Sequence, residues 1–257
     1  MKDYTLKLHK LSDEIVTDGI MAVNKIKTER GLEGYITGGM AGSSYLPPED
    51  HRETVDLDYN LFFGGAVTEY KEITEPLIKN LNEKGYSVKY KKRGSTHDYL
   101  VENDGDSLLI QHQRRSKNNF EKNRESLERE MENRRIISRE GLSYAVLSPE
   151  DIVARKLNRS LKFHTEYDLD FPKNMSQELF KEEIDSIKDN LSSLSSASPR
   201  EISELRLFYD IFDIKSLSKS VGLNKNYFEE AIEDWTNSEV KDTDFARAID
   251  RYEIKLD

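Results

Sequence analysis

Apolar residues follow two different spacings along the chain, and these spacings separate it into two regions. In the first region, apolar positions at helical spacing predict a helix over residues 11–30, which Gly31 ends. Alternating or short apolar runs predict strands over residues 34–37, 54–63, 87–92, 99–102, 108–113 and 142–147. Helices are also expected over residues 40–45 and 67–84, and residues 103–106 (NDGD) are typical of a hairpin turn. The first region therefore mixes strands and helices.

In the second region the strand patterns fade beyond residues 171–172. Ser148 followed by Pro149 is typical of a helix start and predicts a helix over residues 152–161. Further helices are predicted over residues 176–194, 199–213, 214–221 and 225–236, whereas the charged segment 117–135 fits either a long solvated helix or a mobile loop. We therefore expect an α/β (α+β) protein, with a mixed sheet flanked by helices in residues 1–163 and a C-terminal helical domain in residues 164–257.

Composition narrows the class of protein. The 257 residues are 36% hydrophobic and contain no cysteine, which excludes a disulfide framework, a zinc–thiolate site and a cysteine nucleophile. No apolar run approaches the roughly 18 residues that span a bilayer, and the first ten residues are too polar for a signal peptide. We expect a soluble, cytoplasmic protein without a membrane partner.

The net charge of −10 is unevenly distributed. Residues 164–257 hold 22 acidic and 12 basic side chains, so that residues 1–163 hold 27 of each. Two stretches of the neutral half, residues 84–93 and 111–124, are locally basic. They fit either a solvated face or a surface that contacts phosphate.

The segment from residue 36 to residue 63 carries the strongest chemical signal. Asp56 and Asp58 lie two residues apart in an expected strand, so both carboxylates project from one face. Two carboxylates so near each other repel, and a divalent cation that also binds substrate phosphates would explain why both are present. Gly38 and Gly39 would let backbone N–H groups approach a phosphate. An edge strand with two exposed acids is the alternative.

The order of these residues resembles the nucleotidyltransferase superfamily, and most of all its AbiEii branch of toxin–antitoxin and phage-defence toxins. That branch reads G-G-T-A and then R-x-S-x-D-x-D, which correspond here to Gly38-Gly39-Met40-Ala41 and to Arg52, Thr54, Asp56 and Asp58. Residues 146–159 (VLSPEDIVARKLNR) resemble its lysine helix, and residues 208–214 (FYDIFDI) resemble its R-D-x-x-D segment.

The resemblance implies a role for each matching residue. Asp56 and Asp58 would hold Mg²⁺ or Mn²⁺, Gly38 and Gly39 would bind phosphate, and Arg52 and Lys156 would neutralise an NTP. Asp210 would activate the acceptor hydroxyl or orient Lys156, with Asp213 beside it. The alternatives are that Lys156 is a surface lysine and that the two acids face solvent or pair with Arg206. His51, next to Arg52, is either a further phosphate contact or a structural residue.

Three positions depart from the family pattern. Met40 stands where a small hydroxyl residue is usual, and Tyr209 stands where arginine is usual. Polymerase-type members take a third carboxylate from a neighbouring strand, yet residues 108–113 offer only Gln111, His112 and Gln113. A single metal held by Asp56, Asp58 and phosphates is the expectation.

The resemblance implies an enzyme that transfers a nucleotidyl group from an NTP to an RNA acceptor, with tRNA one class, or to a protein, and that has a cognate antitoxin. Two alternatives stay open. The acidic C-terminal half favours a small-molecule nucleotidyltransferase of the aminoglycoside type, and the missing third carboxylate favours a non-catalytic nucleotide-binding protein that retains the fold.

Overall fold

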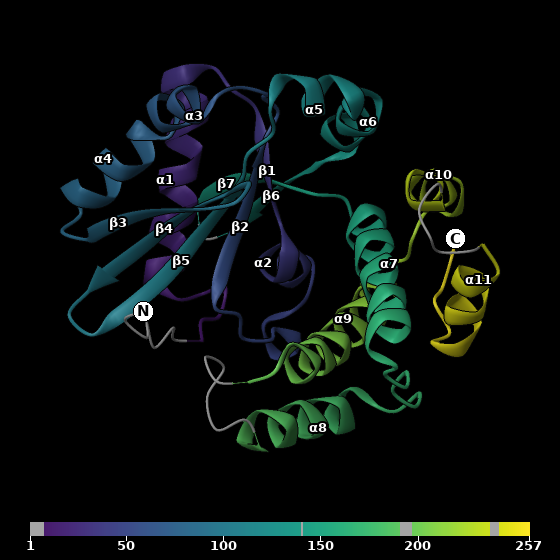
Figure 1. Ribbon diagram of the computed structural model, residues 1–257. Helices are drawn as coiled ribbons and strands as arrows, with labels where there is room; N and C mark the ends of the chain where they lie inside the picture. Colours follow the sequence, from purple (N-terminus) through teal and green to yellow (C-terminus); the bar gives the residue numbers. More distant parts are fainter. Residues whose placement is uncertain (1–7, 140, 191–196, 237–241) are drawn as a thin grey trace. The chain divides into compact units, whose positions relative to one another are not determined.

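The structure is a computed structural model that describes residues 8–139, 141–190, 197–236 and 242–257. It contains a seven-stranded sheet, and helices precede, connect and follow the strands along the chain (Figure 1). The elements are α1 (Glu14–Arg30), β1 (Gly34–Thr37), α2 (Gly38–Ser43), a 3₁₀ turn (Pro48–Asp50), β2 (Asp56–Leu61), α3 (Val67–Ile73), α4 (Glu75–Glu83), β3 (Ser87–Arg93), β4 (Thr96–Asn103), β5 (Asp106–Gln113), α5 (Lys117–Lys122), α6 (Arg124–Asn133), β6 (Arg135–Arg139), β7 (Leu142–Val146), α7 (Pro149–Tyr167), α8 (Gln177–Asn190), α9 (Pro199–Val221), α10 (Lys225–Thr236) and α11 (Asp242–Arg251).

The described chain divides into two compact units, one that ends at Ser148 and one that begins at Pro149. Each unit is described by itself. The sequence places this boundary after Phe163, which lies inside α7. The difference arises because α7 packs against α9 and α10 and so belongs with the helical unit. That each unit is an independently folding domain stays a prediction.

The N-terminal unit is built on a mixed sheet with the strand order β3-β4-β5-β2-β1-β7-β6. The pairs β2/β5 and β1/β7 are parallel, and the other neighbours are antiparallel. Helices α1, α3 and α4 flank this sheet (Figure 1). With the helical C-terminal unit, this arrangement confirms the expected fold class.

The two faces of β2 have different roles. A Cβ added at Gly19 of α1 would lie 3.2 Å from the side chain of Leu57 and 3.4 Å from that of Ile110, so α1 covers the face that these residues share. Both are fully buried. Because successive side chains alternate across a strand, Asp56 and Asp58 project from the opposite face. The apolar residues of β2 therefore anchor the strand, and its two acids lie on the other face of the sheet.

Two turns of this unit lie where the sequence predicts them. Gly31 ends α1 in the left-handed conformation, at φ 67°. Between β4 and β5, Asp104 and Gly105 both have positive φ, as the tight turns of two-residue hairpins require. The predicted hairpin is confirmed.

The C-terminal unit consists of five described helices, in which α7 contacts α9, α10 and α11, and α8 contacts α9. Helix α9 starts with a capping box: the Ser198 side chain accepts a bond from the Glu201 N–H, and the Glu201 carboxylate accepts one from the Ser198 N–H at 2.7 Å. Among the described residues, no helix combines the length and the apolar character needed to cross a bilayer.

Several elements differ from the sequence-based expectations. Residues 67–84 form two helices rather than one, since Pro76 lacks an N–H and its ring obstructs the preceding turn. Segment 117–135 forms α5 and α6, so the mobile-loop alternative is wrong. Residues 199–221 form one helix rather than two, because nothing between Asp213 and Ile214 breaks it. Strand β6 and helix α11 were not expected, and residues 191–194 of the expected helix 176–194 lie outside the described residues.

Candidate functional site

The two acids of β2 lie at the centre of the sheet. Asp58 is paired with Thr37 of β1 on one side and with Gln111 of β5 on the other. Asp56 accepts a hydrogen bond of 2.9 Å from the Thr54 hydroxyl, which fixes one of its oxygens. Both acids are half-buried. The same-face arrangement expected for Asp56 and Asp58 is present, and a central strand carries it, so the edge-strand alternative is wrong.

The Gly38-Gly39 turn brings backbone directly against these side chains. Gly38 has φ 71°, and a Cβ added there would collide with the carboxylate of Asp58. A Cβ added at Gly39 would lie 2.6 Å from Nη2 of Arg52. The positive φ favours glycine at Gly38, and a side chain at either position would displace the acid or the guanidinium. The turn, Arg52 and Asp58 thus form one local constellation.

Arg52 and His51 have separate roles. Arg52 is half-buried, donates from Nη1 to the Glu53 carbonyl at 3.2 Å and holds its guanidinium beside Gly39. The ring of His51 is buried, with Nε2 2.9 Å from the Leu46 carbonyl and 3.2 Å from the Arg139 guanidinium. Burial lowers the pKa of His51 and keeps the ring neutral. His51 is a structural residue of the loop.

A divalent cation is the group that this constellation fits best. Within the described ranges, no three His, Cys, Asp or Glu side chains converge in a way that could hold a metal ion. Two carboxylates on one sheet face remain, beside a turn without side chains. Mg²⁺ commonly takes one or two carboxylates and completes its shell with water and phosphate oxygens. Asp56 and Asp58 therefore suit a metal that arrives with a phosphate-bearing substrate.

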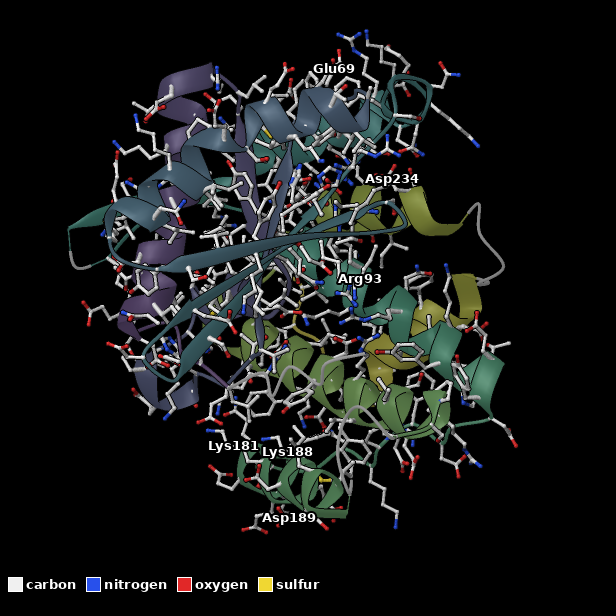
Figure 2. All side chains as sticks on the ribbon, turned by 60° about the vertical axis from the view of Figure 1, so that its left-hand side comes forward. Glu69, Arg93, Lys181, Lys188, Asp189 and Asp234 are labelled. Atoms are coloured by element: carbon white, nitrogen blue, oxygen red, sulfur yellow. The ribbon has the colours of Figure 1, made fainter. Side chains whose placement is uncertain are left out.

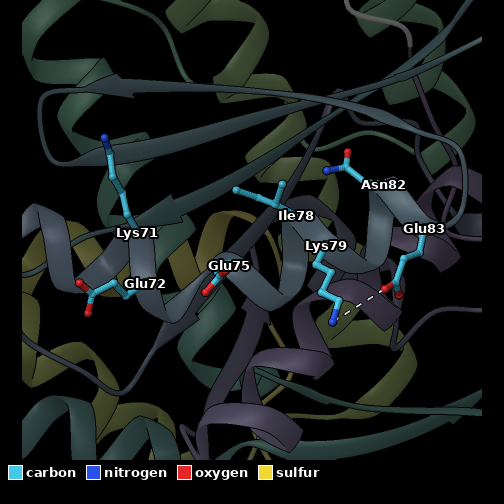
Figure 3. A pocket seen from close by; sticks show the side chains of 7 residues that line it. All are labelled: Lys71, Glu72, Glu75, Ile78, Lys79, Asn82 and Glu83. Carbon is cyan, nitrogen blue, oxygen red and sulfur yellow. Dashed lines mark ion pairs between the residues drawn. The ribbon is translucent and has the colours of Figure 1, made fainter.

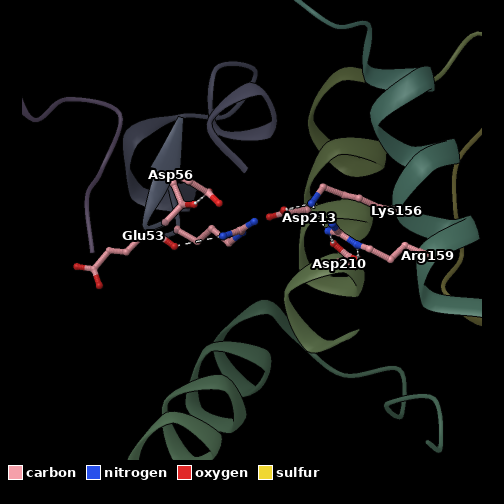
Figure 4. Close-up of polar contacts among 8 residues, drawn as sticks. Glu53, Asp56, Lys156, Arg159, Asp210 and Asp213 are labelled. Atoms are coloured by element: carbon pink, nitrogen blue, oxygen red, sulfur yellow. Dashed lines mark hydrogen bonds and ion pairs between the residues drawn. The ribbon is translucent and has the colours of Figure 1, made fainter. Parts of the chain in front are cut away.

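A second polar cluster lies inside the helical unit. From α7, the Lys156 ammonium contacts Asp210 at 3.0 Å and Asp213 at 2.7 Å, both on α9 (Figure 4). Arg159, one turn after Lys156, donates from Nε to Oδ2 of Asp210 at 2.7 Å. Lys156 is 4% exposed and Asp210 is fully buried. The alternatives that Lys156 is a surface lysine and that the two acids face solvent or pair with Arg206 are therefore wrong.

The charges around Asp210 determine the protonation state of its carboxyl group. Burial by itself would raise the pKa of Asp210, but Arg159 and Lys156 lower it to about 2. The carboxylate thus stays ionised at physiological pH. Asp210 contacts Lys156 directly, which is the geometry needed to orient it.

Arg159 is a member of this cluster that the sequence pattern did not single out. A signal was present, because Arg159 lies three residues after Lys156 and so shares its helix face. Its side chain is 48% exposed although it pairs with the fully buried Asp210. Arg159 thus connects the buried pair to the surface of the unit.

The basic stretch at residues 84–93 is largely the edge strand β3. Lys89 pairs with Glu102, and Arg93, at the exposed end of the strand, pairs with Asp98 (Figure 2). Lys91 and Lys92 are exposed. Lys91 is in register with Asp98, which is in register with Gln111, and Gln111 with Asp58. Lys91 therefore shares the face of the two acids, whereas Lys92 projects from the other face.

An open hollow beside α3 and α4 does not coincide with this constellation (Figure 3). Its lining carries both signs of charge, and Lys79 pairs along α4 with Glu83 at 3.9 Å. The residues that line it are Lys71, Glu72, Glu75, Ile78, Lys79, Asn82 and Glu83. None of them is a site residue expected from the sequence.

Comparison with known proteins gives structural neighbours only. No family model matches the chain, and no curated protein matches it. An antigenic nucleotidyltransferase-like protein from Paracoccidioides brasiliensis is 16% identical, with 97% of this chain and 96% of that chain covered and a TM-score of 0.48. The antibiotic-resistance factor ANT(2'')-Ia is 16% identical over 86% and 92%, with a TM-score of 0.38. The Vibrio cholerae cyclic AMP-GMP synthase DncV is 13% identical over 83% and 71%, with a TM-score of 0.26. These likenesses are distant, since all three TM-scores lie below 0.5.

Proposed function

We propose that the chain is a metal-dependent nucleotidyltransferase, which binds an NTP with Mg²⁺ or Mn²⁺ and transfers a nucleotidyl group to an acceptor hydroxyl. One observation carries the proposal: backbone without a Cβ lies directly against the carboxylate of Asp58 and the guanidinium of Arg52. Two acids, the Arg52 guanidinium and a turn without side chains at one place suit a metal-bound triphosphate.

Each residue of the N-terminal constellation has a role in this proposal. Asp56 and Asp58 hold the cation, which when bound would neutralise the triphosphate and stabilise charge on the leaving group. Because Gly38 and Gly39 have no side chains, a phosphate can contact their backbone N–H groups, and Arg52 donates hydrogen bonds to the phosphate oxygens. Because these groups are fixed before the nucleotide binds, little reorganisation is needed at the moment of transfer.

The helical unit contributes Lys156 and Asp210 to the proposal. Lys156 neutralises the triphosphate, and Asp210 orients Lys156 through the 3.0 Å contact between them. The alternative role for Asp210, proton acceptor for the acceptor hydroxyl, is less favoured. A carboxylate with a pKa of about 2 that pairs with two cations is a weak base.

The acceptor is proposed to be RNA, with tRNA one class, or a protein, and the physiological role is that of a toxin with a cognate antitoxin in the cytoplasm. Support for RNA comes from the position of Lys91 on the acid-bearing face of the sheet. A small-molecule acceptor of the aminoglycoside type is the second candidate. The excess of ten acidic over basic residues in positions 164–257 favours it, since such a surface attracts a cationic substrate.

The test is to incubate the protein with each α-labelled NTP, Mg²⁺ and, separately, total RNA, protein or aminoglycosides. We expect Mg²⁺-dependent label on RNA or protein, lost in Asp58→Asn and retained in Asp104→Asn. Asp104 is a suitable control because it occupies an exposed turn at φ 35°, a conformation that asparagine also adopts. Label on the aminoglycoside would select the second candidate. Nucleotide binding without any transfer would support a non-catalytic protein that retains the fold and would contradict the proposal.

A further inference from the structure

Gln111 occupies the position beside Asp58 on the neighbouring strand. The parallel register of β2 and β5 pairs Asp58 with Gln111 and Asp56 with Leu109. Residues in register on adjacent strands project to the same face, so the Gln111 side chain lies next to the acid pair. The side chain beside Asp58 on β5 thus ends in an amide rather than in a third carboxylate.

The next strand fixes which way that amide points. Gln111 donates from Nε2 to Oδ1 of Asp98 on β4 at 3.0 Å. Arg93 donates from Nε to the other oxygen of Asp98. Asp98 is 5% exposed, and an ionised carboxylate can only accept hydrogen bonds. The NH₂ group of Gln111 must therefore face Asp98, and its Oε1 must point away from β4.

We propose that Gln111 supplies a neutral oxygen ligand to the cation held by Asp56 and Asp58, and that Asp98 is the positioning residue that presents this oxygen. The inference rests on the proposed function and adds a third protein ligand to it. Amide oxygens are ordinary ligands of hard divalent cations.

The exchange of a carboxylate for an amide has a consequence for charge. A divalent cation with two carboxylates is neutral, whereas a third carboxylate would leave one negative charge facing an incoming triphosphate. With Gln111 the site recruits the triphosphate without that repulsion. It also holds too few anionic ligands for a second cation, which agrees with a single-metal site.

The experiment measures binding of Mn²⁺ to the full-length protein by electron paramagnetic resonance, with and without inorganic tripolyphosphate, which carries no base and so avoids a choice of nucleotide. The variants are Gln111→Met, Asp98→Asn, Gln111→Glu and, as controls, Gln113→Met and Asp58→Asn. Gln113 is the matched control, because it lies on the same strand and face but is exposed and paired with Thr96. Circular dichroism checks that each variant is folded.

We expect Gln111→Met and Asp98→Asn to weaken Mn²⁺ binding by about tenfold, the loss typical for ligands and the partners that orient them. Gln111→Glu should bind Mn²⁺ more tightly than the wild type, and Gln113→Met should match the wild type. If Asp58→Asn loses Mn²⁺ while Gln111→Met and Asp98→Asn retain it, the inference is overturned and the proposed function stands. If the wild type itself binds no Mn²⁺ even with tripolyphosphate, both are overturned. Should one variant fail to fold, Gln111→Glu still decides, since equal or weaker binding would contradict a ligand role.

Discussion

Lys156, Arg159, Asp210 and Asp213 carry charges that sum to zero. The ammonium and both carboxylates are almost completely buried, so removing one charge leaves the cluster with a net charge in a medium of low polarity. Truncating one partner of such a buried pair typically costs about 3–5 kcal/mol, whereas removing a matched pair costs far less. The cluster is therefore both a stability element and the proposed source of a catalytic cation.

A double substitution separates these two roles. Lys156→Met should lower the free energy of unfolding by about 3 kcal/mol, because Asp213 loses the Lys156 ammonium while Asp210 keeps Arg159. Lys156→Met/Asp213→Asn should regain much of this loss, because the Arg159–Asp210 pair is then balanced. Urea unfolding measures both values. If the double variant is folded yet inactive, Lys156 is required beyond stability; a double variant no more stable than the single one would contradict this account.

His112 predicts a pH dependence of stability. Its ring is buried, with Nδ1 2.8 Å from the Tyr59 carbonyl, and burial lowers its pKa from 6.5 to about 3. The pKa of His97, which faces it on β4, is also lowered, mainly by burial. The unfolded chain takes up these protons near pH 6.5 and the folded chain does not. The free energy of unfolding should therefore be highest above pH 6.5 and fall by about 2 kcal/mol from His112 alone by pH 5.

Urea titrations at pH 7 and pH 5 check this value. The variant His112→Leu should show a shallower pH dependence, whatever its absolute stability. An unchanged slope would mean that His112 is protonated in the folded protein.

At the scale of elements, β3 is an edge strand whose lysines have two explanations. In the first explanation, charged side chains on an edge strand prevent it from pairing with strands of other molecules. This explanation involves no RNA. Contact with an RNA backbone requires that the basic side chains lie on the face of the acid pair. Lys91 meets this requirement and Lys92 does not, although the two are neighbours and both are exposed.

Single charge reversals of these neighbours decide between the explanations. Lys91→Glu should weaken RNA binding and lower the slope of log affinity against log salt by roughly 0.7–0.9, the value for one lost phosphate contact. Lys92→Glu serves as the matched control and should change neither quantity. Equal effects of both reversals, or of neither, would show that the acid-bearing face does not contact RNA.

The pattern of elements was largely predictable where local chemistry determines it. Gly31 after a helical repeat, and Asp104-Gly105 between two apolar runs, each indicate a turn through the backbone conformation they adopt. Strand β6 was not predictable, because Arg135, Ile136 and Ser138 are exposed and its pairing with β7 determines it. Strand order likewise depends on contacts between distant residues. The placement of Gln111 between Asp58 and Asp98 therefore could not be read from the sequence, although the lack of an acid in that strand could.

The whole molecule divides its chemistry between two units. The sheet unit carries the acid pair, the bare turn and Arg52, and the helical unit carries the buried Lys156 cluster. The sequence motifs pointed to the residues of both groups except Arg159. Motifs could not show that Lys156 is buried between two acids, because that depends on the packing of α7 against α9. The proposed function assigns a role in nucleotide binding to each group, which makes nucleotide binding the property to measure.

The most direct test of the central claim is calorimetry of nucleotide binding with and without Mg²⁺ for the wild type, Asp58→Asn and Asp104→Asn. Relief of like-charge repulsion should leave Asp58→Asn at least as stable as the wild type, so a loss of binding would not reflect unfolding. The account predicts that Mg²⁺-dependent nucleotide affinity disappears in Asp58→Asn and is retained in Asp104→Asn. Unchanged Mg²⁺-dependent affinity in Asp58→Asn would contradict the metal assignment and the function built on it.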